Sequence, residues 1–229
     1  MKKILFFDAT NRWIVVESFY LSEDGKLTNL QRYSGLHNRE SAERLVKEIG
    51  ICLEESGWSS PDLIVTALGP GSFTGIRISV STARNFAQIW KIPVLGFDSL
   101  EVYSSHYFRE EDSAVIVAIE AKQNKIYFAL RDRIGFLGSF DIAPTEPAEI
   151  LPEERLSSYL IARRFTDCPD FFSGENMEDR LPSSESILTE SVAQLQSAIL
   201  DPSRFSFRDL LPNYIRGTYA DHKLKVFLE

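Results

Sequence analysis

The segment Gly69–Gly75, which reads GPGSFTG, holds the residues of this sequence whose types and spacing most resemble a chemical site. An apolar, β-branched segment precedes it and an amphipathic segment follows, so a strand, a glycine loop and a helix are expected in that order. Such a loop could hold a phosphate on backbone N–H groups at the start of the helix. A P-loop is excluded, because Ile76 and Arg77 stand where that motif requires Lys and then Ser or Thr.

Two further chemistries of the loop are disfavoured by its details. A dinucleotide-binding turn would place backbone donors on a pyrophosphate and a carboxylate such as Asp98 on a ribose, but Pro70 has no N–H to donate. A nucleophile elbow needs glycines two residues either side of Ser72, where Pro70 and Thr74 stand. The histidines that a serine hydrolase would need all lie away from the loop in sequence: His37, His106 and His222.

The composition predicts a globular protein without a membrane-spanning segment. Hydrophobic residues make up 44% of the 229 residues, yet no apolar run approaches the roughly 20 residues of a spanning helix. Asp8 interrupts the apolar start, so no signal peptide is expected and the expected location is the cytoplasm.

A net charge of −8 disfavours unaided binding to nucleic acid, and the basic stretch 216–225 is interpreted as a solvated end. Cys52 and Cys168 are expected to be reduced, with no metal bound.

The chain contains a weak internal repeat. Ile4–Glu17 aligns within the segment Val115–Leu130 at a constant offset of 112 residues, which places Asp8 on Glu120. In each copy an apolar strand ends in an acidic residue and Ala, crosses a polar turn and returns as a second strand. A third extended segment follows in each copy, so each half is expected to begin with a β-meander.

The repeat predicts two similar lobes. Residues 1–102 are expected to form an N-terminal lobe that carries the GPGSFTG loop, and residues 103–229 a smaller C-terminal lobe. A mixed sheet flanked by helices in each lobe gives an α/β fold, and this plan resembles the actin, Hsp70 and sugar-kinase superfamily, in which a cleft between two lobes holds ATP. Helices are expected at 38–56, 74–90, 147–160 and 191–200, and Asn38 is expected to be the N-cap of the first. Beyond the meanders, strands are expected at 62–68, 93–97 and 169–174. Residues 205–229 are not placed.

The predicted helix over residues 74–90 has two uncharged faces. One stripe, expected to pack on the sheet, contains Ile76, Val80, Ala83, Ala87 and Trp90. A second stripe begins with small residues and ends with large ones, namely Gly75, Ser79, Thr82, Phe86 and Ile89. Helices with two such faces usually bury both, so the second stripe is interpreted as an interface with helix 38–56, with another subunit, or with both. The alternative is that one lobe buries both faces.

The ten residues GPGSFTGIRI resemble the defining loop of the TsaB (YeaZ) family, and the resemblance covers most of the chain. Asp8 ends the first strand, His37 opens the first helix, and PNYIR at residues 212–216 is similar to the family's C-terminal P-x-Y-x-R. The resemblance implies an actin-like, non-catalytic scaffold that forms homodimers and uses largely the same helical surface to pair with a TsaD-type enzyme. With a TsaE-type ATPase, that pair makes threonylcarbamoyladenosine beside the anticodon of tRNA, which is bound only through the complex.

Roles follow for the residues of this sequence. The partner interface is expected to contain His37, Ala42, Leu45, Ile49, Ser72, Phe73, Gly75, Ser79, Thr82 and Phe86, and the loop to be shaped by Gly69, Pro70, Gly71, Gly75 and Arg77. Phe73 is either packed into the core or an exposed anchor for the partner. Asp8 and Thr10 are weak candidates for nucleotide contacts, because the turn Asp8-Ala9-Thr10 departs from the family's Asp-Thr-Ser. No cofactor is expected to bind tightly to this chain. ATP or ADP is expected at the interface with the enzyme subunit.

No catalytic or metal site is expected. TsaD-type enzymes carry the metal motif H-x-x-x-H, whereas His37 is followed four positions later by Ser41, and one imidazole cannot make that site. The alternative function is a small ATP-binding enzyme or a glycoprotease-like peptidase that acts alone, with Asp8 or Ser72 as the residue on which its activity would depend.

Overall fold

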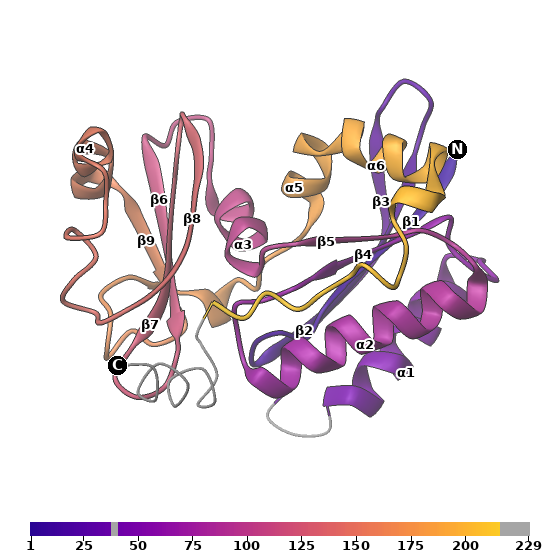
Figure 1. Cartoon of the computed structure of the whole chain (residues 1–229), viewed down its shortest axis with the longest axis horizontal. Helices are drawn as coiled ribbons and strands as arrows, with labels where there is room; N and C mark the ends of the chain where they lie inside the picture. The colour runs from indigo at the N-terminus through magenta and orange to yellow at the C-terminus, as the bar shows by residue number, and fades with distance from the viewer. Residues whose placement is uncertain (38–40, 216–229) are drawn as a thin grey trace, which may run out of the picture.

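The computed structural model describes residues 1–37 and 41–215, which form two lobes, each built on a five-stranded mixed sheet (Figure 1). In the first sheet the strand order is β3-β2-β1-β4-β5. Strand β1 pairs antiparallel with β2 and parallel with β4, and β4 pairs parallel with β5. The strands are β1 (Lys2–Asp8), β2 (Trp13–Leu21), β3 (Leu27–Leu36), β4 (Leu63–Ala67) and β5 (Val94–Phe97).

The second sheet repeats this arrangement in the order β8-β7-β6-β9-β10. Strands β6, β7 and β8 form an antiparallel meander, and β9 and β10 add to it in parallel. These strands are β6 (Ala114–Glu120), β7 (Ile126–Asp132), β8 (Gly135–Ile142), β9 (Arg163–Thr166) and β10 (Glu175–Asn176). Because order and direction agree between the sheets, the predicted duplication and the predicted α/β actin-like fold class are confirmed.

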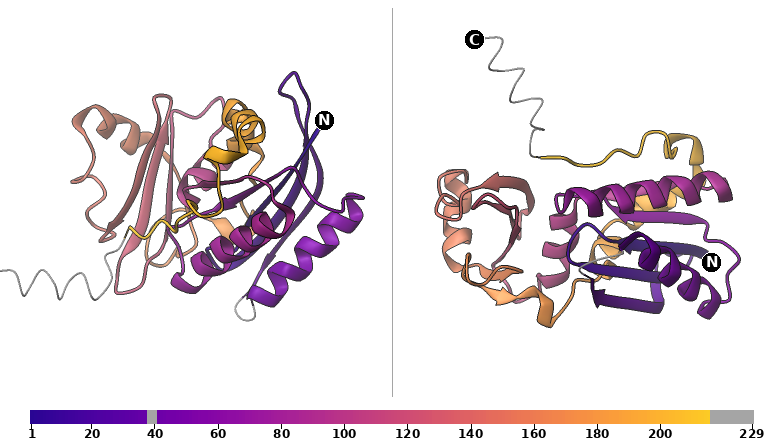
Figure 2. Two further views of the ribbon diagram at one scale, coloured as in Figure 1. Left: turned by 45° about the vertical axis from the view of Figure 1, so that its right-hand side comes forward. Right: turned by 90° about the horizontal axis from the view of Figure 1, so that it is seen from below.

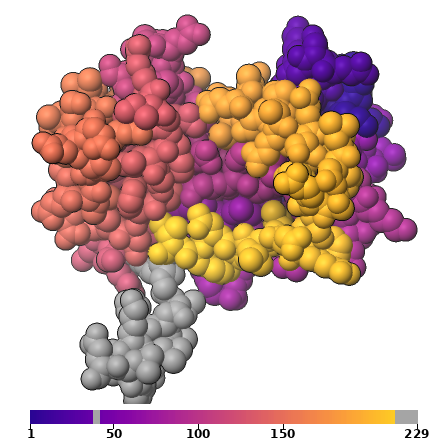
Figure 3. Space-filling model, turned by 45° about the horizontal axis from the view of Figure 1, so that its top comes forward, coloured from indigo at the N-terminus to yellow at the C-terminus, as the bar shows by residue number. Residues whose placement is uncertain are grey.

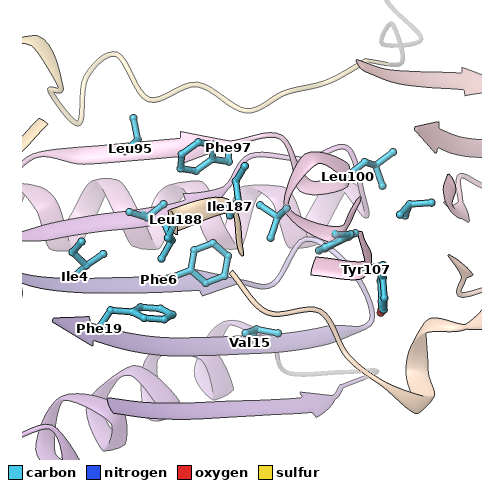
Figure 4. Packing of buried hydrophobic residues seen from close by; sticks show 14 of the residues in the cluster. Ile4, Phe6, Val15, Phe19, Leu95, Phe97, Leu100, Tyr107, Ile187 and Leu188 are labelled. Atoms are coloured by element: carbon cyan, nitrogen blue, oxygen red, sulfur yellow. The ribbon is translucent and has the colours of Figure 1, made fainter. Parts of the chain in front are cut away.

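Alternate residues of the first sheet face two different cores. Ile4 and Phe6 on β1 face the side covered by α5 and α6, and Figure 4 shows this core, whereas Leu5 and Phe7 face α1 and α2. Figure 1 shows the two helix pairs on opposite faces of the sheet. A central strand covered on both sides has no polar face, which explains the continuous apolar run of β1. The helices are α1 (Ser41–Glu55), α2 (Phe73–Trp90), α5 (Glu185–Glu190) and α6 (Val192–Leu200).

Helix α3 (Ser99–Tyr107) joins the two lobes. It contacts β6, β7 and β8 of the second sheet and α5 on the first lobe. Its buried Tyr103 and Tyr107 belong to a core that contains Val15 of the first sheet and Val117 of the second. The boundary between residues 102 and 103 falls within this helix, so the division of the chain at that point stays a prediction.

The second half of the chain differs from the sequence-based elements. Helix α4 (Glu153–Ile161) begins later than the predicted helix 147–160, whereas the predicted helix 191–200 agrees with α6 within one residue. The strand predicted at 169–174 is wrong: β9 lies earlier in the chain, and Phe172 is buried from an irregular segment. Pattern analysis misses β9 because two arginines open it; the charge of Arg163 is balanced by Asp112 at 3.0 Å. Asn38, the predicted N-cap, lies outside the described residues.

Residues 201–215, called the C-terminal strap below, run along the edge of β5 (Figures 1 and 2). They begin with the short 3-10 helix η2 (Pro202–Arg204). The backbone N–H of Val94 on β5 donates to the carbonyl of Phe205 at 3.0 Å, and Leu210 is buried in the core beneath α1 and α2. The strap therefore covers an edge strand. In Figure 3 it crosses the surface toward the second lobe. Near its end, Asn213 N donates to the carbonyl of Leu68, next to the GPGSFTG loop.

A buried carboxylate ties the start of α5 to the first sheet. Glu17 on β2 is fully buried and accepts hydrogen bonds from Ser183 Oγ (2.7 Å), Ser184 N (2.8 Å) and Ser184 Oγ (2.5 Å). Arg32 on β3 pairs with Glu17 at 2.8 Å and also donates to the carbonyls of residues 181 and 182. Because a buried charge is tolerated only when its lone pairs are filled, this cluster fixes the point at which the chain returns to the first lobe.

We predict that Glu17→Gln lowers the free energy of unfolding by about 2–3 kcal/mol, because a neutral amide loses the ion pair and places a donor where hydroxyls now donate. Urea denaturation of the whole chain measures the change. Glu54→Gln is the matched control, since Glu54 is exposed on α1 and a surface substitution changes stability by less than about 0.5 kcal/mol. Equal stability of the two variants would contradict the role given to Glu17.

Candidate functional site

The GPGSFTG loop lies between β4 and α2 and packs directly on the turn that follows β1. Ser72 N donates to the carbonyl of Thr10 at 2.7 Å. A Cβ atom added to Gly71 would stand 2.2 Å from the same carbonyl oxygen, and one added to Gly75 would stand 2.2 Å from the carbonyl oxygen of Ala9. At both positions only glycine fits, because backbone meets backbone.

Several polar groups of the loop are hydrogen-bonded inside the chain. Ser72 is the N-cap of α2, and its Oγ accepts from Gly75 N at 2.9 Å. Gly69, whose φ of +102° is one that side-chain-bearing residues rarely adopt, donates its N–H to Ser99 Oγ at 3.0 Å. Ile76 N donates back to the Ser72 carbonyl. With Pro70 lacking an N–H, these groups cannot act together as a phosphate cradle.

The two candidates for nucleotide contacts, Asp8 and Thr10, are buried and do not line the cavity described below. Asp8 accepts from Thr10 N (2.7 Å), Thr10 Oγ1 (2.7 Å) and Tyr103 OH (2.6 Å), and Thr10 Oγ1 lies 3.0 Å from Ser99 Oγ. Burial raises the pKa of Asp8, partly opposed by the hydrogen bond from Tyr103. The assignment of nucleotide contacts to these residues is therefore corrected: Tyr103, which sequence analysis missed, occupies the space beside the carboxylate.

A cavity of about 500 Å³ lies between the lobes, next to the loop. Its walls are the turn after β1, the loop itself, the turn after β6 and the end of the C-terminal strap. Arg12 closes one side, where it pairs with Glu178 at 2.8 Å and with Asp167 at 3.7 Å. The residues that line it are Asn11, Arg12, Pro70, Gly71, Ser72, Phe73, Ile76, Glu120, Ala121, Lys122, Tyr127, Asp167, Asn213, Tyr214 and Ile215.

The outer side of the loop presents an aromatic cluster. Phe73 is 53% exposed. It is therefore on the surface and not packed into the core. The guanidinium carbon of Arg77 lies 3.7 Å from the centre of the Phe73 ring, and the ring of Tyr214 lies 5.6 Å from it. Arg77 Nε donates to Tyr214 OH at 3.3 Å. A guanidinium over the face of an exposed ring favours one orientation of that ring.

Four residues assigned to the partner interface are instead packed inside the lobe, and this assignment is corrected. Gly75 and Ser79 face the turn after β1, where Ala9 N donates to Ser79 Oγ at 2.8 Å. Leu45 and Ile49 belong to the core between α1 and the sheet. Small residues at the start of α2 thus let the helix approach a turn of its own lobe. The interface candidates that remain accessible are His37, Ala42, Ser72, Phe73, Thr82 and Phe86, with Phe86 stacked on Trp90 at 4.6 Å.

His37 takes part in a small network on the α1 side. Its Nε2 lies 2.6 Å from Tyr33 OH, and Arg44 donates to the same hydroxyl at 3.3 Å while pairing with Glu48 at 2.8 Å. Burial and the neighbouring Arg44 lower the pKa of His37. Within residues 1–37 and 41–215, no group of three or more His, Cys, Asp or Glu side chains is arranged to hold a metal ion.

The geometry does not favour a serine hydrolase at Ser72 or a ribose contact at Asp98. Among the described residues no histidine is hydrogen-bonded to Ser72, and His106 lines a second cavity bounded by Arg32 and Glu185, where burial lowers its pKa to about 4. His222 and the basic stretch 216–225 lie outside the described residues. Asp98, the residue that a ribose would need, caps α3 through Leu100 N at 2.8 Å.

Comparison with known proteins gives consistent findings. A family model described as "TsaD: tRNA N6-adenosine threonylcarbamoyltransferase" matches residues 29–158, which is more than half of the chain. The tRNA threonylcarbamoyladenosine biosynthesis protein TsaB of Escherichia coli is 32% identical over 94 residues, which are 40% of this chain and 41% of that protein. TsaB of Haemophilus influenzae is 30% identical over 129 residues, 55% of this chain and 52% of that protein. The matches thus span about two fifths to one half of the curated relatives.

Solved structures resemble the chain over nearly its whole length. YeaZ from Pseudomonas aeruginosa has a TM-score of 0.68 at 20% identity, with 93% of this chain and 100% of that one covered. A second structure, named as an uncharacterized protein with similarity to peptidase YEAZ from the same organism, has a TM-score of 0.69 at 20% identity and covers 94% and 100%. These similarities show a common fold. In the described part of this chain, every helix is too short or too polar to cross a membrane.

Gly71→Ala is expected to lower the free energy of unfolding by roughly 2 kcal/mol or more, because its Cβ would overlap the Thr10 carbonyl and the loop would have to move. Gly50→Ala is the matched control: a Cβ at Gly50 meets nothing within 4 Å, and alanine in a helix is favoured over glycine by up to about 1 kcal/mol. Denaturant midpoints measure both changes. Stabilisation by both substitutions would refute the close contact between loop and turn.

Tyr103→Phe is expected to lower stability by about 2 kcal/mol at pH 7, because it removes a donor from the buried carboxylate of Asp8. The folded-state pKa of Asp8 is raised above its usual 3.8. Above that raised pKa the carboxylate is charged in the folded chain, and its burial opposes folding. As the pH falls toward 3.8, Asp8 takes up a proton in the folded chain, and this opposition is lost. The loss in Tyr103→Phe should therefore shrink on acidification. Tyr107→Phe removes a hydroxyl that donates to the Arg180 carbonyl, so its loss should vary little with pH.

Proposed function

The chain belongs to the family described as TsaD, tRNA N6-adenosine threonylcarbamoyltransferase, with relatives named TsaB, and on this premise we propose that it is a non-catalytic subunit of a threonylcarbamoyladenosine-forming complex. In this role it pairs with a TsaD-type enzyme, which modifies the tRNA adenosine next to the anticodon. A TsaE-type ATPase joins the pair, and a homodimer forms when the enzyme is absent.

The observation that supports this proposal most is the internal engagement of the groups that could do chemistry. The hydroxyl of Ser72 caps a helix, the carboxylate of Asp8 accepts three hydrogen bonds, and the imidazole of His37 is hydrogen-bonded to Tyr33. Nucleophiles and general bases act when they are free to reach a substrate. A family loop whose Ser72 hydroxyl caps a helix and whose Gly69 and Ser72 N–H groups donate to its own chain is better suited to shape a surface.

The surface proposed for both partners is the α1–α2 face, defined here by Ala42, Val46, Thr82, Phe86 and Ile89, together with Phe73 at its end. Helices α1 and α2 lie side by side in Figures 1 and 2 and contact each other. Val46 is 49% exposed and Ile89 is 68% exposed. Large apolar side chains at such exposure on adjacent helices favour an interface with another protein.

Partners and ligands follow from charge and burial. A chain with a net charge of −8 is a poor match for the tRNA backbone, so tRNA is bound through the complex, in the cytoplasm. The turn around Asp8 offers no open phosphate site, so ATP or ADP is assigned to the interface of the assembled subunits and not to this chain alone.

The proposal is tested by reconstituting tRNA modification with the TsaD-type and TsaE-type proteins of the same organism, with and without this chain. We expect threonylcarbamoyladenosine to form efficiently only when the chain is present. Light scattering after size-exclusion chromatography should show a homodimer that gives way to a heterodimer. Val46→Arg and Ile89→Arg should weaken both assemblies at least about tenfold, because each buries a charge in an apolar contact.

Leu160→Arg is the matched control for these variants, since Leu160 is 75% exposed on α4 of the other lobe. It should assemble and support modification like the unmodified chain. Modification that is equally fast without the chain would refute the proposed function. Nucleotide hydrolysis or proteolysis by the purified chain alone, lost in Asp8→Ala or Ser72→Ala, would favour the enzyme alternative instead.

A further inference from the structure

The end of the C-terminal strap is bonded to the base of the GPGSFTG loop. Asn213 N donates to the carbonyl of Leu68 at 2.8 Å, and Asn213 Nδ2 donates to Asp98 Oδ2 at 2.8 Å. The fit is close, since a Cβ added to Gly69 would stand 2.9 Å from the Asn213 carbonyl oxygen. These contacts are made by a segment that has no helix or strand of its own from residue 205 onward, so they decide where its end lies.

Asp98 connects this end of the strap to both lobes. Its Oδ1 accepts from Ser139 Oγ on β8 at 2.7 Å and from Leu100 N at the start of α3, while its Oδ2 accepts from Asn213. A hydrogen bond to a charged group is stronger than one between neutral groups. One carboxylate thus sets the positions of the second sheet, of α3 and of the strap relative to one another.

The next residue of the strap, Tyr214, holds the aromatic cluster on the outer side of the loop. Its hydroxyl accepts from Arg77 and its ring stands beside Phe73, so the exposed Phe73 contacts both a guanidinium and a phenol. Tyr214 also lines the interlobe cavity with Asn213 and Ile215. A side chain already fixed in its bound orientation loses less entropy when a partner covers it.

We propose that Asn213 and Tyr214 form a latch. When it is seated, the strap closes the interlobe cavity and holds Phe73 and Arg77 in the orientation that a partner protein recognises. When it is released, the cavity opens and that orientation is lost. The identity of the partner rests on the proposed function, whereas the latch itself is a property of this chain.

Hydrogen exchange of the isolated full-length chain tests the latch. Asn213→Ala removes the bond to Asp98, and we expect the amides of residues 213 and Ser99 to exchange about tenfold faster, because both donate to carbonyls at the base of the loop. Leu211→Ala is the matched control, since Leu211 is on the same strap and 64% exposed. Unchanged exchange in Asn213→Ala, at an unchanged urea midpoint, would overturn the latch.

A binding measurement with the TsaD-type protein tests the second half of the proposal. Asn213→Ala and Tyr214→Ala should each weaken the heterodimer about tenfold, and Leu211→Ala should leave it unchanged. Faster exchange with undiminished affinity would overturn the link between latch and partner. If Ile89→Arg abolishes binding while the latch variants bind normally, the proposed function stands and the latch fails. If the unmodified chain does not bind, the proposed function fails and the exchange result alone decides the latch.

Discussion

The packing of the GPGSFTG backbone against the turn after β1 is the contact on which the rest of the site depends. Gly71 and Gly75 lie so close to the carbonyls of Thr10 and Ala9 that no Cβ fits. This approach directs the N–H of Ser72 into the protein and lets Ser79 accept from Ala9. A loop in van der Waals contact with the neighbouring turn leaves no room between them for a phosphate, so another molecule can meet the loop only from the interlobe cavity or from its outer side.

The two copies of the repeated unit have diverged at the ends of their first strands. Asp8 ends β1 and is buried under the hydroxyl of Tyr103, whereas Glu120 ends β6, is exposed and lines the interlobe cavity. After Glu120 the chain turns through Lys122, Gln123 and Asn124, all with positive φ, and the segment that follows β9, the counterpart of β4, contains no glycine before Gly174. The same topology therefore gives a closed turn in one lobe and an open one in the other.

Sequence analysis predicts the first sheet and the meander of the second because the repeat and the apolar strands are encoded locally, whereas it misses β9 and β10. It could not show that Gly75 and Ser79 face inward, because a helix with two uncharged faces gives no sign of which one meets its own lobe. Tyr103 was missed because α3 is short and lacks an amphipathic stripe, and its role depends on a carboxylate 95 residues away. The sequence does not place the strap because it has no periodic pattern, although PNYIR contains the two residues that reach the loop.

The internal hydrogen bonds of the loop both occupy its polar groups and make its surface rigid. Each hydroxyl, carboxylate or amide that is bonded within the loop is unavailable for catalysis, and each such bond also removes a motion of the loop. Phe73 shows the result, because its ring is exposed and yet contacts both Arg77 and Tyr214. Association is weakened by the entropy of ordering side chains, so a surface ordered in advance binds better than a mobile one with the same contacts. The features that argue against an active site at the loop therefore favour its proposed use in protein recognition.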